Sequence, residues 1–374
     1  MYLLQDIQQQ THDLACTLRQ YQLRYGKLPV TLLASSLLVR LLTDGSLDYG
    51  ITDAPLPQRT PSLLAYIRQQ SEQLIHDQRY GLGSNYHYLI ASLTQFLGER
   101  ELLLDQLTPD LVKSYETWLF HTCGISRNTS SNYMRQLRAI YNRAVAQGIV
   151  ADQHPFRQVY TGISRTPHRA LSLDQIRAIK RLDLSSFPQL SLARDLFMFS
   201  FYTQGMAFVD MAFLRTEAIT GGKLTYHRQK SRQTITLRWE PEMAQLVERI
   251  WQQASATPLC RHSSTVRTAS PFLLPILGSG SPSELYHQYR MASHQCNELL
   301  HRLESHLELP IPLTMYVARH SWATGAYRSN IPVETISQAL GHSQGNEHIT
   351  RIYLDTIEQP DADRQKRKII EKVS

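Results

Sequence analysis

The spacing of apolar residues predicts a chain that is helical over most of its length. In the segment SNYMRQLRAIYNRAVAQG, residues 131–148, four apolar side chains fall on one face of a helix: Met134, Leu137, Tyr141 and Val145. Gly148 is suited to end that helix. Further along the chain, Ser172 can cap the start of another helix, and Gln175 completes a capping box with it.

One short region has the pattern of β-strands instead. In KLTYHRQKSRQTITLRW, residues 223–239, apolar and polar residues alternate on both sides of a polar turn, which predicts a hairpin. The inward-facing residues are Leu224 and Tyr226 on the first strand and Ile235 and Leu237 on the second. Because the surrounding segments have helical spacing, we expect a mainly α fold with a small antiparallel β-sheet.

Breaks in these patterns divide the chain into three segments. Residues 1–54 form an amphipathic helical extension of unknown role, and the proline-rich stretch DAPLPQRTP separates them from the rest. Residues 62–160 are helix-rich. Residues 171–374 follow the stretch GISRTPHRA and contain the hairpin.

Composition narrows the function classes. The 374 residues carry a net charge of +7, which favours a polyanionic partner. The four cysteines, Cys16, Cys123, Cys260 and Cys296, form no CxxC pair, and their spacing indicates a reducing, cytoplasmic setting. We expect no signal peptide, because the first residues lack its basic and apolar regions, and no apolar run reaches membrane-spanning length.

Arginines concentrate in one part of the chain. Between residues 124 and 170 there are seven arginines and a single acid, Asp152. A solvated helix face usually mixes charges of both signs, so this bias makes nucleic-acid binding the favoured interpretation over a merely solvated face. The candidate DNA-binding residues are Arg127, Arg135, Arg138, Asn142, Arg143 and Arg165.

Four polar residues in the last segment suggest chemistry. Lys230 lies at the tip of the predicted hairpin, and Arg319 lies in an otherwise apolar helix, where it needs a carboxylate or a bound phosphate as partner. Gly341 can end the helix before His342 and so hold the imidazole at a fixed point. Tyr353 alone would be interpreted as an ordinary core aromatic, because its neighbours have helical spacing.

The order of a hairpin lysine, VARHSWAT, LGHS and IYL resembles the catalytic domain of site-specific tyrosine recombinases, the phage integrase family. Three stretches are most similar to the branch of bacterial mobile-element integrases and DNA invertases: FSFYTQGMAFVDMAFL, SPFLLPIL and IPLTMYVARHSWATGAY. Residues 62–160 resemble the family's helical, SAM-like core-binding domain. The resemblance implies that the two domains form a C-shaped clamp around duplex DNA.

The resemblance also implies roles. In the family, a tyrosine attacks a DNA phosphate and forms a 3′-phosphotyrosyl link, without metal, ATP or another cofactor. Tyr353 would be the nucleophile, Arg319 a contact to the phosphate and Lys230 the general acid. His342 would bond to the phosphate or assist the tyrosine. Tyr316, three residues before the arginine, would bond on the phosphate side, and His320 is expected to pack or to support a neighbouring site residue.

The chain departs from the family at one arginine. The branch places it in a phrase like FYxRGMSFVDM, but this chain reads FYTQGMAFVDM, with Gln204 at that position. The register usual in the wider family points to Ala207, which cannot serve either. Three explanations stay open: natural impairment, an alteration that slows cleavage, or replacement by another arginine such as Arg194, Arg215 or Arg228.

The partners implied by the resemblance are double-stranded DNA with inverted-repeat sites and three further copies of the chain, as a tetramer on two DNA sites. The resemblance leaves room for accessory DNA-bending proteins, and we expect a bacterial protein of the cytoplasm, associated with the nucleoid, with no membrane partner. The C-terminal tail is expected to pack on a neighbouring copy. Two alternatives stay open: a type IB topoisomerase-like enzyme, and a non-catalytic DNA-binding protein derived from a recombinase. A zinc site is not expected, because His301 and His306 lack the spacing of helical ligands.

Overall fold

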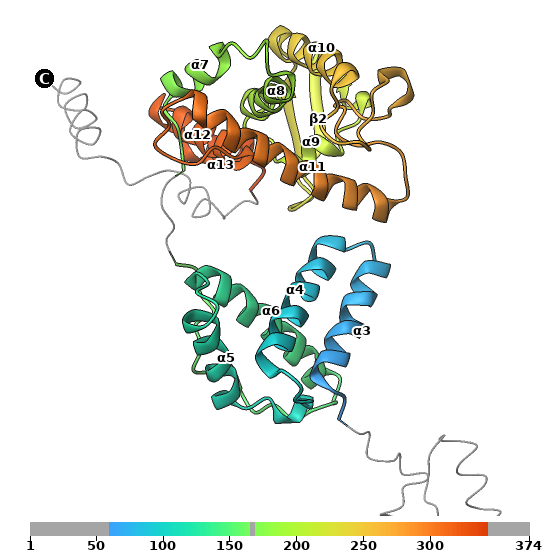
Figure 1. The fold of residues 1–374 in the computed structure, drawn as a ribbon, viewed down its shortest axis with the longest axis vertical. Coiled ribbons are helices and arrows are strands. Elements are labelled where there is room, and N and C mark those ends of the chain that lie inside the picture. The colour runs from blue at the N-terminus through green and yellow to red at the C-terminus, as the bar shows by residue number, and fades with distance from the viewer. Residues whose placement is uncertain (1–59, 165–168, 343–374) are drawn as a thin grey trace, which may run out of the picture. The chain divides into compact units, whose positions relative to one another are not determined.

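The computed structural model describes residues 60–164 and 169–342. Figure 1 shows the fold of these residues. Their regular structure is mostly helical, with one small antiparallel sheet in the second part, so the predicted fold class is confirmed. The predicted extension at residues 1–54 and the C-terminal tail lie outside the described residues, as do residues 165–168 of the stretch GISRTPHRA.

The first part is helical. Its elements are α3 (Leu63–His76), α4 (Tyr80–Leu97), the 3₁₀ turn η1 (Leu104–Gln106), α5 (Pro109–His121) and α6 (Arg127–Ala146). Helices α3 and α4 lie side by side (Figure 1). Helix α5 begins where Thr108 caps it by accepting a hydrogen bond from the backbone of Leu111, and the hydroxyl of Tyr115 donates to Ser92 on α4 at 2.7 Å.

Helix α6 confirms the predicted apolar stripe. Met134, Leu137 and Tyr141 are buried, and Val145 is half-buried. The helix ends at Ala146, and Gly148 follows with a φ of +69°, a left-handed conformation that glycine adopts at little cost. The arginines of α6 therefore lie outside this buried stripe, and each is exposed or half-buried.

The second part is organised around one buried helix. Its elements are α7 (Leu173–Arg181), α8 (Pro188–Tyr202), α9 (Phe208–Ala212), η2 (Thr216–Ala218), β1 (Ile219–Thr220), β2 (Lys223–His227), β3 (Thr234–Arg238), α10 (Pro241–Ala256), η3 (Arg267–Ala269), α11 (Pro282–Leu303), η4 (Glu304–His306), α12 (Met315–Arg328) and α13 (Val333–Ala339). Helix α8 contacts α7, α10, α11 and α12 (Figure 1). Because it is covered on several sides, α8 is apolar around most of its circumference.

The hairpin forms as the alternation predicts. The sheet order is β1-β2-β3, with all pairs antiparallel. Leu224 pairs with Leu237 and Tyr226 with Ile235 on the buried face, while the exposed face carries the intervening threonines. Lys230 lies in the turn between β2 and β3, as expected.

Helix ends in this part are fixed by capping residues. Ser172 and Gln175 form the predicted capping box at the start of α7. Pro332 is the N-cap residue of α13, which begins at Val333. Gly341 follows the C-cap Leu340 with a φ of +66°, which turns the chain sharply and leads it to His342.

Candidate active site

A close approach of two backbone segments positions Arg319. Gly205, in the loop between α8 and α9, has a φ of +76° and lies against α12. A Cβ atom at this position would be 2.8 Å from the Cα of Arg319. Only glycine fits this contact without a shift of the backbone, and Gln204 immediately precedes it with its own φ at +62°.

Arg319 is buried on α12, with 3% of its surface exposed. Its guanidinium donates from Nη1 to the carbonyl of Gly205 at 2.7 Å and from Nη2 to the carbonyl of Leu340 at 2.6 Å. One side chain thus joins the α8–α9 loop to the end of α13. A cation held by two carbonyls in the protein interior is well placed to attract an anion, because the surrounding dielectric is low.

A second arginine reaches the same place from the hairpin. Arg228, which follows β2, is 8% exposed and donates from Nη1 to the carbonyl of Gly341 at 2.8 Å. The hydroxyl of Ser231 donates to the same carbonyl at 2.9 Å. The turn that carries Lys230 is therefore fastened to the end of α13, beside Leu340.

A buried carboxylate lies beneath this turn. Asp210, on α9, is 4% exposed and accepts a hydrogen bond from the backbone of Gln229 at 2.8 Å. Burial raises the pKa of its carboxyl, while the bond from Gln229 and the positive charges of Arg228 and Arg319 act in the opposite direction. The carboxylate of Asp210 thus interacts electrostatically with both Arg228 and Arg319.

His342 is the residue at which these elements meet. Its backbone N–H donates to the carbonyl of Ser337 at 3.0 Å, which continues the turn after α13. Burial, as the largest cause, and the charges of Arg319, Arg228 and Lys230 together lower the pKa of the imidazole to about 4. The ring is therefore neutral near pH 7 and can accept or donate a hydrogen bond.

Tyr316 and His320 occupy one edge of the site on α12. Their rings lie 4.6 Å apart, edge to face, one helical turn from each other. His320 is buried, which agrees with the packing role expected of it, whereas Tyr316 is 49% exposed and presents its phenol to solvent.

The structure brings together four of the six predicted catalytic positions around Arg319. The charges of Arg319 and Lys230 act on His342, and Gln204 precedes Gly205, whose carbonyl accepts a hydrogen bond from Arg319. Tyr316 lies on the same helix as Arg319, and Tyr353 lies outside the described residues. Sequence reasoning placed no role on Asp210 or Ser231. The acid in FVDM and the serine after Lys230 were the available signals.

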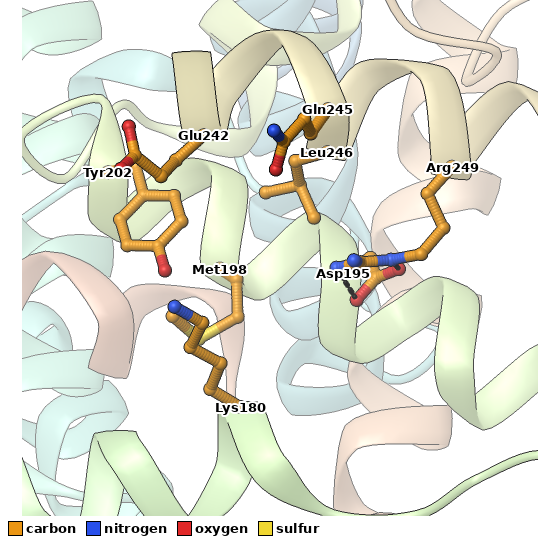
Figure 2. A pocket seen from close by; sticks show the side chains of 8 residues that line it. All are labelled: Lys180, Asp195, Met198, Tyr202, Glu242, Gln245, Leu246 and Arg249. Atoms are coloured by element: carbon orange, nitrogen blue, oxygen red, sulfur yellow. Dashed lines mark hydrogen bonds and ion pairs between the residues drawn. The ribbon is translucent and has the colours of Figure 1, made fainter. Parts of the chain in front are cut away.

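A small cavity of about 70 Å³ lies elsewhere in this part, between α7, α8 and α10 (Figure 2). Figure 2 shows Arg249 directed at Asp195 and Lys180 pointing toward the ring of Tyr202. Asp195 is completely buried and accepts bonds from Arg249 at 2.6 and 3.0 Å and from Arg194 at 2.9 Å. This network joins α8 to α10, so we assign it a structural role.

The arginines of α6 differ in their surroundings. Arg138 and Asn142 are exposed, and Arg135 is half-buried. Arg127 lies over the ring of Tyr160, with 4.1 Å between the guanidinium carbon and the ring centroid. The remaining predicted residues are Arg143, which donates to the side-chain oxygen of Gln70 at 2.6 Å, and Arg165, which lies outside the described residues.

The residues that the structure describes contain no group of three or more histidines, cysteines or acids that could hold a metal ion. None of the described helices combines the length and apolarity needed to cross a membrane. The three cysteines described, Cys123, Cys260 and Cys296, are free thiols.

Two protein-family models match the chain, one in each of its two described parts. The family model described as the phage integrase SAM-like domain matches residues 62–159, and the model of the phage integrase family matches residues 174–359. No curated protein is similar to the chain.

Solved structures share the fold. The integrase of transposon Tn1549 in complex with transposon right end DNA is 14% identical, with a TM-score of 0.57 over 83% of this chain and 100% of that one. The lambda integrase tetramer bound to a Holliday junction is 14% identical, with a TM-score of 0.53 over 91% of this chain and 85% of that one. A lambda integrase dimer bound to a COC′ core site is 13% identical, with a TM-score of 0.53 over 80% of this chain and 100% of that one.

Proposed function

The chain belongs to the phage integrase family of tyrosine recombinases, and we propose that it catalyses site-specific recombination of DNA through a 3′-phosphotyrosyl intermediate. The observation that carries the proposal is the meeting of Arg319, Lys230 and His342 at the end of α13. The three side chains come from α12, the hairpin and the turn after α13, and two of them shift the pKa of the third. Two positive charges beside a neutral imidazole form a suitable binding site for an anionic phosphate.

Each group has a defined part in the proposed reaction. The hydroxyl oxygen of Tyr353 attacks the scissile phosphorus, and the bond from phosphorus to the 5′-oxygen breaks. Arg319 stabilises the negative charge that grows on the non-bridging oxygens, and Lys230 gives a proton to the departing 5′-oxygen. Attack by a 5′-hydroxyl of another strand reverses these steps and rejoins the DNA. The phosphodiester energy is conserved in the tyrosyl link, so the reaction needs neither ATP nor a metal.

His342 acts as a neutral imidazole in this scheme. Because its pKa is lowered to about 4, the ring is unprotonated at neutral pH and can accept a hydrogen bond from the hydroxyl of Tyr353. It is a weak base, so we assign it orientation of the phenol and brief acceptance of its proton. Tyr316, which is exposed on α12, would bond on the phosphate side.

We assign DNA binding outside the reacting phosphate to the first part of the chain. Arg127, Arg138 and Asn142 are exposed on or beside α6 and suit contacts to the DNA backbone. The lambda integrase tetramer bound to a Holliday junction supports a tetramer on two DNA sites as the working form. The clamp arrangement, the inverted-repeat sites and the accessory DNA-bending proteins stay predictions, as do the domain limits.

A covalent-trapping assay tests the function. Duplexes that bind the full chain are selected from a random-sequence pool and nicked at successive positions along one strand, so that a cut next to the nick cannot be rejoined. Wild type, Gln204→Arg and Tyr353→Phe are then compared on a denaturing gel. We expect a protein–DNA adduct that needs Tyr353 and increases with Gln204→Arg.

Gln204 favours one other function, that of a non-catalytic DNA-binding protein. A glutamine can donate a hydrogen bond but carries no charge, and loss of one preorganised donor slows such reactions by about 100- to 1,000-fold. The same assay separates the two functions. Binding to the selected duplex without adduct in any lane, Gln204→Arg included, would assign the chain to the binding class and refute the recombinase.

A further inference from the structure

We propose that Arg228 supplies the second positive charge at the scissile phosphate, in the role that an arginine at position 204 would have filled. The inference rests on the recombinase function proposed above and names one more catalytic residue for that reaction. It concerns a residue of the hairpin, whereas Gln204 lies in the α8–α9 loop. The loop supplies Gly205, whose carbonyl binds Arg319, and the hairpin binds Gly341, the residue after Leu340, whose carbonyl also binds Arg319.

Arg194 is excluded because it is engaged elsewhere. Its guanidinium donates to Asp195 at 2.9 Å, to the carbonyl of Leu182 at 2.8 Å and to the hydroxyl of Ser191 at 3.0 Å. These bonds belong to the network around Asp195, of which Figure 2 shows the contact with Arg249. A guanidinium held in this way serves the packing of α8 and α10.

Arg215 is excluded by its position. It precedes η2, its side chain is exposed, and its backbone pairs with that of Phe272. The cations whose charges act on His342 are Arg319, Arg228 and Lys230. Of the three arginines that could replace the missing one, Arg228 alone belongs to this set.

The contacts of Arg228 place it next to Arg319. The carbonyls that the two arginines hold belong to Leu340 and Gly341, which are adjacent in the chain and have Cα atoms about 3.8 Å apart. The positive charges of both guanidiniums also act on Asp210, where they oppose the rise in its pKa caused by burial. Two cations that share an acid and hold successive carbonyls must lie as close neighbours.

The surroundings suit Arg228 to act on a transition state. Its side chain is buried, so its charge is less screened than that of an exposed arginine. The bond to Gly341 holds the guanidinium in place before the reaction, and Ser231 fixes the same carbonyl. A preorganised cation two residues before Lys230 can neutralise a non-bridging oxygen while the lysine protonates the leaving oxygen.

The first test measures single-turnover cleavage by the full chain on the selected nicked duplex. Arg228→Gln should slow adduct formation by about 100-fold or more, which is the loss typical of a removed preorganised donor. Arg228→Lys, which keeps the charge, should retain more activity. The matched control is Arg238→Gln, which removes an exposed arginine at the other end of the hairpin and should leave the rate unchanged.

The second test distinguishes charge neutralisation from a purely structural role. The same duplex is made with a methylphosphonate at the scissile position, which removes the negative charge of that linkage. If Arg228 neutralises this charge, the loss caused by Arg228→Gln should shrink to about tenfold or less on the neutral linkage. A loss caused by a displaced Gly341 or a weakened fold would be the same on both linkages and would overturn the inference.

A third test restores the arginine that Gln204 replaces. Gln204→Arg should restore most of the activity that Arg228→Gln removes, because both side chains would act on one phosphate. No rescue, or cleavage by Arg228→Gln at the wild-type rate, would refute the role of Arg228 while leaving the recombinase function standing. If wild type and Gln204→Arg both form no adduct, the proposed function fails, and this inference fails with it.

Discussion

Substitution of Gly205 by alanine should both lower the stability of the second part of the chain and reduce DNA cleavage. The position combines a left-handed backbone with a tight contact: a Cβ atom would lie 2.8 Å from Cα, 2.9 Å from Cγ and 3.0 Å from Cβ of Arg319. Ordinary contacts between carbon atoms are about 3.5–4.0 Å. The methyl group would therefore push α12 away from the α8–α9 loop.

Two effects add up in this substitution. The left-handed conformation costs alanine about 1–2 kcal/mol, from which the lower entropy of the unfolded chain subtracts about 0.4–1 kcal/mol. Overpacking of a well-packed site adds about 1–3 kcal/mol. The total of about 1–5 kcal/mol corresponds to a fall in Tm of about 2–20 °C for a domain of this size.

The matched control is Gly221→Ala. Gly221 has a φ of +59° and no atom within 4 Å of the added Cβ, so it carries the backbone effect without the contact. Thermal unfolding of both variants, followed by circular dichroism, should show a clearly larger loss for Gly205→Ala. DNA cleavage should fall only for Gly205→Ala, because Arg319 moves. Equal losses of Tm in the two variants would refute the packing explanation.

Three further predictions follow from the site, the basic helix and the tail. Burial and neighbouring cations lower the pKa of His342 to about 4 from 6.5, so the unfolded chain takes up this proton more readily. Its contribution to stability should be complete above pH 6.5 and be lost toward pH 4, and in urea unfolding His342→Gln should lose less stability than wild type between pH 7 and 5. Equal losses would contradict the lowered pKa. Affinity for duplex DNA should fall steeply with salt, and Arg138→Gln should reduce the slope of log K against log salt by about 0.9, whereas Arg177→Gln, an exposed arginine paired with Asp174, should not. A flat salt response would exclude phosphate contacts by α6. Removal of the residues after Asp363 should preserve DNA binding but weaken tetramer assembly, and an unchanged mass in light scattering would refute the predicted role of the tail.

The sequence by itself determined the elements and most of the candidate catalytic set. The alternation of Leu224 and Tyr226 with Ile235 and Leu237 predicted the hairpin, and the Ser172 capping box predicted the start of α7. Such signals can be recognised in the sequence because they arise from backbone hydrogen bonds and side-chain spacing within a few residues. The motifs that contain Lys230, Arg319 and His342 were recognised instead by their resemblance to a known family.

The tertiary structure alone decided which charges act together. Arg228 bonds to Gly341 across 113 positions of sequence, and Arg319 bonds to Gly205 across 114. An arginine two residues before a hairpin lysine has no special signature, and neither does a glycine after a glutamine. Their importance comes from burial against the end of α13, where a low dielectric strengthens the interaction between charges. That environment is created by packing of distant segments, which no local pattern of residues encodes.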